Sequence, residues 1–138
     1  MNDDNYVVYI DGGSSGNPGE SAIGGVIIFP DGKKETYSHK IGYATNNYAE
    51  YSALIAGLTR AHELGGTEVE CVLDSELITN QMKGLYKIKE PTLQKLFVQA
   101  YNAATKFKKV TYRHILRENN KEADRLVNET LDKQTILK

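Results

Sequence analysis

The apolar positions in the first third of the chain have the spacing of β-strands. Residues 6–11 are a run of β-branched and aromatic side chains that ends in a carboxylate and precedes two glycines, which is typical of a buried strand. We expect a loop over residues 12–19, a second strand over 22–29, and a third over 33–41 after the turn Pro30-Asp31-Gly32. These segments predict an antiparallel meander of three strands.

After residue 44 the apolar residues recur every three or four positions, which is the period of an amphipathic helix. Short apolar runs between these helical stripes predict two further strands. We expect helices over residues 45–64, 77–82, 91–104 and 120–131, and strands over residues 69–73 and 110–116.

The order of these elements predicts a single domain over all 138 residues. A meander followed by strands that alternate with helices predicts a mixed five-stranded sheet, in which two parallel strands join the three antiparallel ones. Helices that connect parallel strands pack on the faces of the sheet, so we expect an α/β fold with helices on both faces. The tail at residues 134–138 is expected to fray.

Composition and charge argue against two classes of protein. Hydrophobic residues make up 40% of the chain and no segment is long and apolar enough to span a bilayer, which argues against a membrane protein. The formal net charge of −1 argues against binding of nucleic acid through bulk positive charge, so any such contact is local. The start, Met1-Asn2-Asp3-Asp4, lacks the features of a secretory signal, so we expect a cytoplasmic protein. We also expect a monomer without an obligate protein partner.

Four carboxylates lie at the ends of predicted strands or near the starts of predicted helices. Asp11 and Asp74 end two predicted strands, and the carboxyl ends of parallel strands meet at one edge of a sheet. Glu50 and Asp124 lie near the starts of two predicted helices, where the helical period directs both along the apolar stripe. The ordinary alternative for these two is that acids in the first turn interact favourably with the helix dipole.

Taken together, the four acids predict a metal site. Like charges about 4 Å apart repel by roughly 4 kcal/mol per pair at an effective dielectric constant of about 20, so a positive partner has to hold them together. No lysine or arginine is adjacent in sequence to Asp11 or Asp74, whereas a divalent cation would keep such carboxylates ionised. Ligand sets made only of oxygen favour Mg²⁺ or Mn²⁺, and several carboxylates suit two ions about 3.5–4 Å apart.

In their order and spacing, five short motifs resemble the type 1 ribonuclease H family. Each motif is weak alone, but their register over one short domain makes the resemblance specific, and it covers nearly the whole chain. The motifs are Tyr9-Ile10-Asp11-Gly12-Gly13, Gly16-Asn17-Pro18-Gly19, Thr45-Asn46-Asn47-Tyr48-Ala49-Glu50, Leu73-Asp74-Ser75 and Asn120-Lys121-Glu122-Ala123-Asp124.

The resemblance implies a ribonuclease H-like fold and metal-dependent hydrolysis of the RNA strand of an RNA/DNA hybrid. It also implies endonucleolytic cuts that leave 5′-phosphate and 3′-hydroxyl ends. By the same analogy, Asp11, Glu50, Asp74 and Asp124 hold two Mg²⁺ or Mn²⁺ ions, one activating the attacking water and the other stabilising the leaving 3′ oxygen.

Positions that contact substrate in that family also have counterparts in this chain. Asn17, Asn46 and Asn47 match positions that contact the minor groove, where amides distinguish RNA from DNA through the 2′-hydroxyl. Thr45 matches a helix N-cap that lies near a phosphate of the other strand. The alternative for all of these residues is an ordinary role in turns and helix caps.

Three features depart from many members of the family. The segment before the last predicted helix is short and lacks a histidine, so altered turnover is expected; Arg117 there is able to contact phosphate, although an exposed arginine beside Glu118 is the simpler interpretation. The basic protrusion of some members is missing, and Lys87 and Lys89 are expected to replace it in part. Glu76 stands where many members carry an amide, so double-stranded RNA stays open as a substrate.

Two other functions are compatible with these residues. The missing histidine and the low net charge favour a catalytically weak or silent domain that binds hybrid or duplex RNA, whereas the complete set of acids argues against it. A 3′-5′ exonuclease of the same architecture typically carries Asp-x-Glu on the first strand, where this chain has Asp11-Gly12-Gly13. An endoribonuclease is therefore the leading hypothesis.

Overall fold

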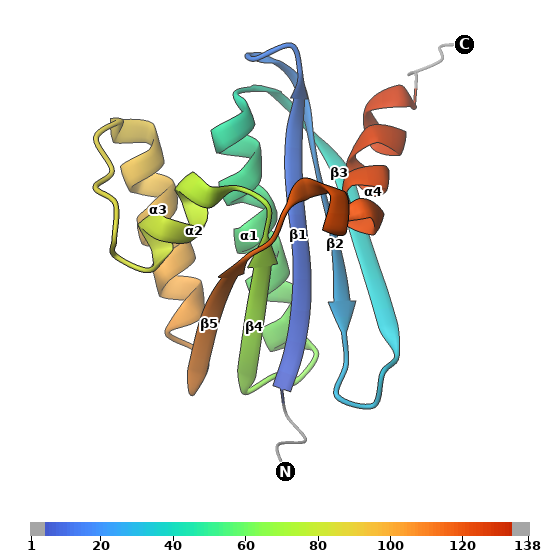
Figure 1. Ribbon diagram of the computed structural model, residues 1–138, viewed down its shortest axis with the longest axis vertical. Helices are drawn as coiled ribbons and strands as arrows, with labels where there is room; N and C mark the ends of the chain where they lie inside the picture. Colours follow the sequence, from blue (N-terminus) through green and yellow to red (C-terminus); the bar gives the residue numbers. More distant parts are fainter. Residues whose placement is uncertain (1–4, 134–138) are drawn as a thin grey trace.

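The computed structural model describes residues 5–133, which form one five-stranded sheet flanked by helices (Figure 1). The acidic opening residues and the predicted frayed tail lie outside this range. The strands are β1 Asn5–Ser15, β2 Gly19–Ile28, β3 Lys34–Ala44, β4 Glu68–Leu73 and β5 Lys109–His114. The helices are α1 Asn46–Glu63, α2 Glu76–Met82, α3 Pro91–Ala104 and α4 Lys121–Asp132, with a 3-10 turn, η1 Arg117–Asn119, before α4. None of these helices combines the length and apolarity needed to cross a membrane.

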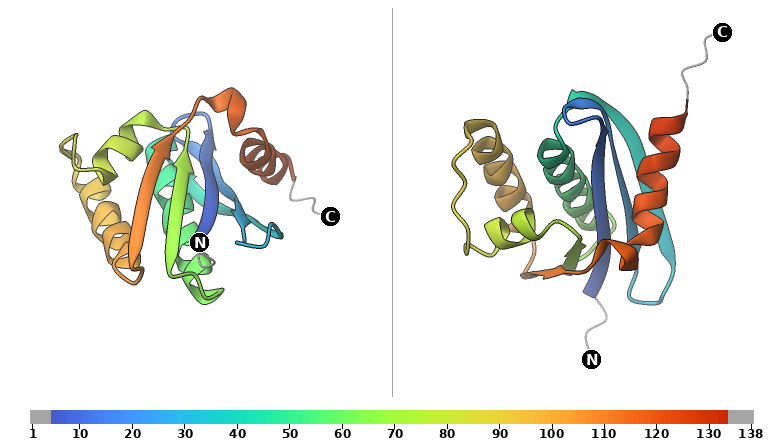
Figure 2. Two further views of the ribbon diagram at one scale, coloured as in Figure 1. Left: turned by 60° about the horizontal axis from the view of Figure 1, so that its bottom comes forward. Right: turned by 45° about the horizontal axis from the view of Figure 1, so that its top comes forward.

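The sheet is mixed, as the sequence predicts. Its order is β3-β2-β1-β4-β5, and β2 runs antiparallel to both of its neighbours, whereas β4 runs parallel to β1 and to β5. Helix α1 packs on one face of the sheet and α3 packs against α1, while α4 covers the other face over β1 and β2 (Figures 1 and 2). The predicted α/β architecture with helices on both faces is confirmed.

The main core lies between the sheet and α1. Alternate residues of β1 and β4 face inward, and one side of α1 closes over them. Fully buried members of this core include Val8 and Ile10 of β1, Cys71 of β4, and Leu54 and Leu58 of α1. This packing holds the start of α1 beside β1, where the candidate site lies.

The first strand is longer than the sequence predicts. Residues 12–15 do not form the predicted loop; they continue β1, paired throughout with β2, and only residues 16–18 make the turn. Glycines weaken isolated strands, but the backbone pairing to β2 needs no side chain and persists through both of them. The parallel ladder to β4 nevertheless stops at Ile10, opposite Leu73. Asp11 therefore still lies where the two parallel strands part.

Candidate active site

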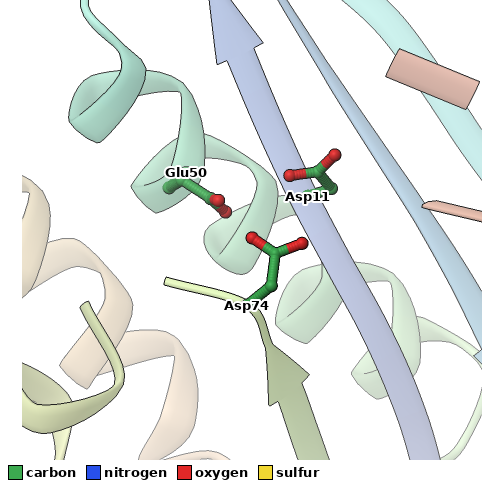
Figure 3. Close-up of side chains that lie close together, drawn as sticks. All are labelled: Asp11, Glu50 and Asp74. Atoms are coloured by element: carbon green, nitrogen blue, oxygen red, sulfur yellow. The ribbon is translucent and has the colours of Figure 1, made fainter. Parts of the chain in front are cut away.

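Three acidic side chains converge at the edge of the sheet where β1 and β4 part (Figure 3). Asp11 is the first residue of β1 beyond its pairing with β4, and Asp74 is the first residue after β4 ends. Glu50 reaches the same point from the second turn of α1, whose first turn is capped by the Thr45 side chain. One carboxylate oxygen of each acid lies within 4.8 Å of those of the other two.

The close approach of α1 to β1 depends on Gly12. A Cβ atom at this position would lie 2.3 Å from the carbonyl oxygen of Ala49 and 2.7 Å from the backbone nitrogen of Glu50. Because glycine has no Cβ, the backbone of the helix fits against the strand. The residue after Asp11 is thus what allows Glu50 to join the two carboxylates of the strands.

Two of the three acids are buried, and their burial opposes ionisation. Asp11 is 1% exposed and Glu50 is 6% exposed, and within residues 5–133 both oxygens of Asp11 and one of Glu50 are buried without a hydrogen-bond partner. Burial first, then the charges of Asp74 and Asp124, raises the pKa of Asp11 to about 8, whereas Arg117 acts to lower it. Burial and the charge of Asp11 also raise the pKa of Glu50 well above its ordinary value. Buried carboxylate oxygens without donors fit a divalent cation with hard oxygen ligands.

The metal-free protein is expected to lose stability as the pH rises. Folding raises the pKa of Asp11, so the folded state holds this proton more tightly; its contribution to stability is complete below about pH 3.8 and is lost as the pH rises through about 8. Glu50 shifts in the same direction and adds to the loss. Thermal unfolding in a chelator should show a Tm that falls from about pH 5 to about pH 9, and Mn²⁺ should remove most of this fall. A Tm that rises over the same range in the chelator would contradict the prediction.

Asp124 lies at the margin of the cluster. It stands in the first turn of α4 with its side chain 32% exposed, and it is not one of the three acids whose oxygens meet within 4.8 Å. Its charge nevertheless raises the pKa of Asp11, so the two carboxylates are neighbours. Arg117 Nη2 lies 3.8 Å from Asp124 Oδ1, and Asn128 Nδ2 donates to Asp124 Oδ2 at 3.3 Å. The predicted fourth acid thus stands beside the site and is less buried than Asp11 and Glu50.

A pocket of about 270 Å³ lies over the carboxylates and is lined by acids and hydrogen-bond donors. Arg117 forms part of its wall with a side chain that is 72% exposed, so the exposed arginine that the sequence favoured lies beside the acids. The other lining residues come from β1, the start of α1 and the junction of β4 with α2: Gly12, Asn46, Asn47, Glu50, Asp74 and Ser75. A guanidinium and two amides beside a carboxylate cluster suit a phosphodiester, because its oxygens accept hydrogen bonds from both kinds of donor.

Two of the predicted substrate-binding asparagines are oriented by hydrogen bonds to backbone. The side-chain oxygen of Asn46 accepts from the backbone N–H of Ser14 at 2.8 Å, and that of Asn17 accepts from the backbone N–H of Asn46 at 3.0 Å. Both carbonyl oxygens are therefore in use. The parts of these amides that are left to meet a ligand are their NH₂ groups, which are donors.

A larger groove of about 700 Å³ adjoins the pocket through Asn47, which lines both. The groove also contains Asn17 and Thr45, and the Thr45 hydroxyl accepts a backbone N–H of α1 at 3.1 Å, so the predicted N-cap is confirmed. The structure thus brings the predicted contact residues of the β1–β2 turn and of the α1 start to one surface. Lys87 and Lys89 are exposed in the connection between α2 and α3 and line neither hollow.

Asn120 is a further candidate, for which the sequence predicts no role although it stands in one of the motifs. Its side chain is 2% exposed and donates to the Asp74 carboxylate. The signal in the sequence is its spacing, because Asn120 stands four residues before Asp124 and the two lie one helical turn apart. That spacing alone does not distinguish a buried amide from an ordinary residue before a helix.

The chain matches one protein family and is similar to curated proteins. The profile of a family described as reverse transcriptase-like matches residues 9–130. The bifunctional protein Rv2228c of Mycobacterium tuberculosis is 45% identical over 128 residues, which cover 91% of this chain and 35% of that protein. The chain therefore spans about a third of the length of this curated relative.

Two solved structures share the fold over nearly their whole length. RNase H1 from the halophilic archaeon Halobacterium salinarum superposes with a TM-score of 0.91 at 39% identity, covering 94% of this chain and 99% of that one. LC11-RNase H1, solved in complex with an RNA/DNA hybrid, superposes with a TM-score of 0.87 at 43% identity, covering 93% of this chain and 97% of that one. The likeness to both proteins extends to sequence as well as fold.

Proposed function

Since this chain belongs to the type 1 ribonuclease H family, we propose that it is an endoribonuclease that hydrolyses the RNA strand of RNA/DNA hybrids. The observation that carries the proposal is the convergence of Asp11, Glu50 and Asp74 within 4.8 Å at a buried edge of the sheet. The related LC11-RNase H1, whose structure holds an RNA/DNA hybrid, supports the choice of substrate.

In this proposal Asp11, Glu50, Asp74 and Asp124 hold two Mg²⁺ or Mn²⁺ ions. When bound, these ions supply an activated water and stabilise the leaving 3′ oxygen, which gives 5′-phosphate and 3′-hydroxyl ends. Asp11, Glu50 and Asp74 are close enough for one cation to be shared among them. Asp124 completes the set from α4, on the more exposed side.

Arg117 is proposed to hold the phosphate that is cleaved. Its side chain lines the pocket together with Asp74 and Ser75, and it is the charge that acts to lower the pKa of Asp11. A guanidinium binds two phosphate oxygens at once, which fixes both the position and the orientation of the group. Arg117 therefore supplies positive charge from the protein beside the acids.

Arg117→Ala is expected to lower kcat/KM about 10- to 100-fold, because a hydrogen bond to a charged group contributes roughly 1.5–3 kcal/mol. Arg117→Lys keeps the charge without the planar fork and should recover part of the loss. Arg125→Ala is the matched control, since Arg125 lies on the exposed side of α4 and pairs with Glu129. Hybrid cleavage rates that are equal for Arg117→Ala and the control would remove Arg117 from the proposed site.

Asn17 and Asn46 are proposed to recognise the substrate through their NH₂ groups. Because their carbonyl oxygens accept backbone N–H groups, only donors face a ligand, and these suit 2′-hydroxyl oxygens and acceptors in the minor groove. Asn47 lines both the pocket and the groove, so it stands between the two strands of a bound duplex. Thr45 lies in the groove, where we propose that a phosphate of the DNA strand binds.

Binding of the duplex is proposed to be weak and sensitive to salt. Lys87 and Lys89 are exposed in the connection between α2 and α3 and are proposed to neutralise phosphates there. Glu76, the exposed first residue of α2, places negative charge two residues after Asp74. Double-stranded RNA is therefore included as a second substrate to be tested.

The proposal is tested with the purified protein and a labelled RNA/DNA hybrid, in Mg²⁺, in Mn²⁺ and in a chelator. We expect cuts within the RNA strand that carry 5′-phosphate ends and that require either metal. Matched DNA duplex and single-stranded RNA serve as controls. An RNA duplex tests whether a protein with Glu76 at this position also cleaves double-stranded RNA. Intact hybrid in both metals would overturn the proposal.

A catalytically weak or silent domain that binds hybrid or duplex RNA is the second candidate. It is favoured by the region before α4, where the short turn η1 holds Arg117–Asn119 and contains no histidine. Binding of the hybrid without turnover in either metal would support this candidate. Cleavage of the hybrid above the rate of the chelator control would exclude a silent domain.

The proposed enzyme works as a monomer without an obligate partner. We also propose that all 138 residues form one domain and that the protein is cytoplasmic.

A further inference from the structure

Asn120 joins three parts of the candidate active site through one side chain. It lies between η1 and α4, is 2% exposed, and uses its NH₂ group twice. Asn120 Nδ2 donates to the carbonyl oxygen of Ile10 at 2.8 Å and to Oδ2 of Asp74 at 2.9 Å. Ile10 directly precedes Asp11, so the amide spans the point where the two parallel strands part.

The side chain of Asn120 does not serve the usual purpose of an asparagine before a helix. Such residues cap the helix by accepting a backbone N–H, but the Asn120 side chain makes no capping hydrogen bond to α4. Only its backbone carbonyl contributes, by accepting from the N–H of Asp124 at 3.1 Å. The start of α4 would therefore keep this hydrogen bond if the amide were removed.

Packing does not explain the amide either. Among the residues that the structure describes, Asn120 Oδ1 is one of four buried side-chain atoms that lack a hydrogen-bond partner, and such an atom destabilises the fold. The other three atoms belong to Asp11 and Glu50. An apolar side chain of the same size would not bury an unsatisfied oxygen, but it could not donate to Asp74.

We propose that Asn120 is a positioning residue that orients the Asp74 carboxylate for shared metal ligation. The inference rests on the proposed function and adds a positioning residue to the same site. The hydrogen bond to Oδ2 restricts rotation of the Asp74 carboxylate. Because the same amide also donates to the Ile10 carbonyl, it fixes the position of this carboxylate relative to the backbone next to Asp11. Through its backbone, Asn120 also places the first turn of α4, which carries Asp124. A neutral donor achieves this without adding a cation that would compete with the metal.

Asn120→Ala is expected to lower kcat for the hybrid about 10- to 100-fold with little change in KM, because partners of metal ligands affect metal affinity and activity to this extent. Mn²⁺ binding measured by calorimetry without substrate should weaken by about the same factor. Asn120→Asp keeps the size of the side chain, replaces the donor by an oxygen, and should be at least as impaired. Asn119→Ala is the matched control, since Asn119 is the exposed neighbour in η1.

The outcomes separate this inference from the proposed function. If the unchanged protein does not cleave the hybrid, the proposed function fails, and Mn²⁺ binding by the variants still tests Asn120. Circular dichroism shows whether each variant is folded, and Asn120→Asp decides the matter if Asn120→Ala is not. A folded Asn120 variant that binds Mn²⁺ as tightly as Asn119→Ala would overturn the inference. A lower kcat with an unchanged affinity for Mn²⁺ would also overturn it, since that result indicates a purely structural role.

Discussion

Asp11→Asn is expected to abolish cleavage of the hybrid and at the same time to stabilise the metal-free protein. Asparagine is close in size to aspartate but carries no charge, so the site loses a ligand with little change in shape. A loss of about 4 kcal/mol in transition-state stabilisation corresponds to a fall in kcat of roughly 10³-fold. The gain in stability follows because Asp11 is buried beside other acids and neither of its oxygens has a partner within residues 5–133.

The gain in stability should depend on pH in a definite direction. Between about pH 4 and about pH 8 the folded metal-free protein keeps the Asp11 proton while the unfolded chain releases it, so the aspartate protein loses stability over this range and the Asp11→Asn variant does not. The stability gained by Asp11→Asn should therefore grow with pH, by on the order of 2 kcal/mol between about pH 6 and about pH 9, and level off above about pH 8. Thermal unfolding in a chelator at about pH 6 and about pH 9 measures this difference.

Asp132→Asn provides the matched control, because Asp132 is an exposed acid at the end of α4. This variant should keep full activity and a nearly unchanged Tm at both pH values. Two results would contradict the prediction for Asp11. One is cleavage by Asp11→Asn at more than about a tenth of the normal rate, and the other is a lower Tm of Asp11→Asn at high pH in the chelator.

Gly12→Ala is expected to destabilise the protein by about 3 kcal/mol or more and to remove activity from any molecules that still fold. The new Cβ would lie 2.3 Å from the carbonyl oxygen of Ala49 and 2.7 Å from the backbone nitrogen of Glu50. Both atoms belong to the backbone of α1, so rotation of a side chain cannot relieve the contact. Movement of the helix away from β1 would relieve it, and this movement would carry Glu50 away from Asp11.

The adjacent glycine offers a control for the same substitution in the same strand. A Cβ at Gly13 would meet only Cγ1 of Val127 at 3.4 Å, which is an ordinary contact with a side chain. Gly13→Ala should therefore change the free energy of unfolding by less than about 1 kcal/mol and keep most of the activity. Denaturant unfolding of both variants measures the difference, and equal stabilities would show that Gly12 does not limit the approach of the helix.

Local patterns in the sequence were sufficient to predict most elements of the fold. The apolar run at residues 6–11 and the helical period after residue 44 correspond to β1 and α1, and the Thr45 cap is present as expected. These features depend on neighbours in sequence: the side chains of a strand alternate between two faces, and a cap bonds to a residue three positions along. Their prediction does not require knowledge of the distant partner.

The errors arose where a distant partner decides the outcome. The glycines after Asp11 predicted a loop, but pairing with β2 extends the strand to Ser15. Asn120 has a polar side chain of the kind common on surfaces, yet it is buried and donates to Asp74. Arg117 is exposed as the sequence indicated, but only folding brings it to the pocket beside the acids. Nothing in the residues next to them indicates which groups they will meet after folding.

Patterns along the chain were sufficient to predict the α/β class, the order of strands and helices, and the acids at which those elements meet. These properties follow from periodicity and from the rule that parallel strands end at a common edge. The folded structure was needed to show that Asp11 and Glu50 are buried, that the half-buried Asp74 meets them while Asp124 lies at the margin, and that Asn120 ties the strands to α4. Burial and the orientation of a carboxylate depend on atoms from segments far apart in the chain, and those atoms come together only when the sheet and its helices pack.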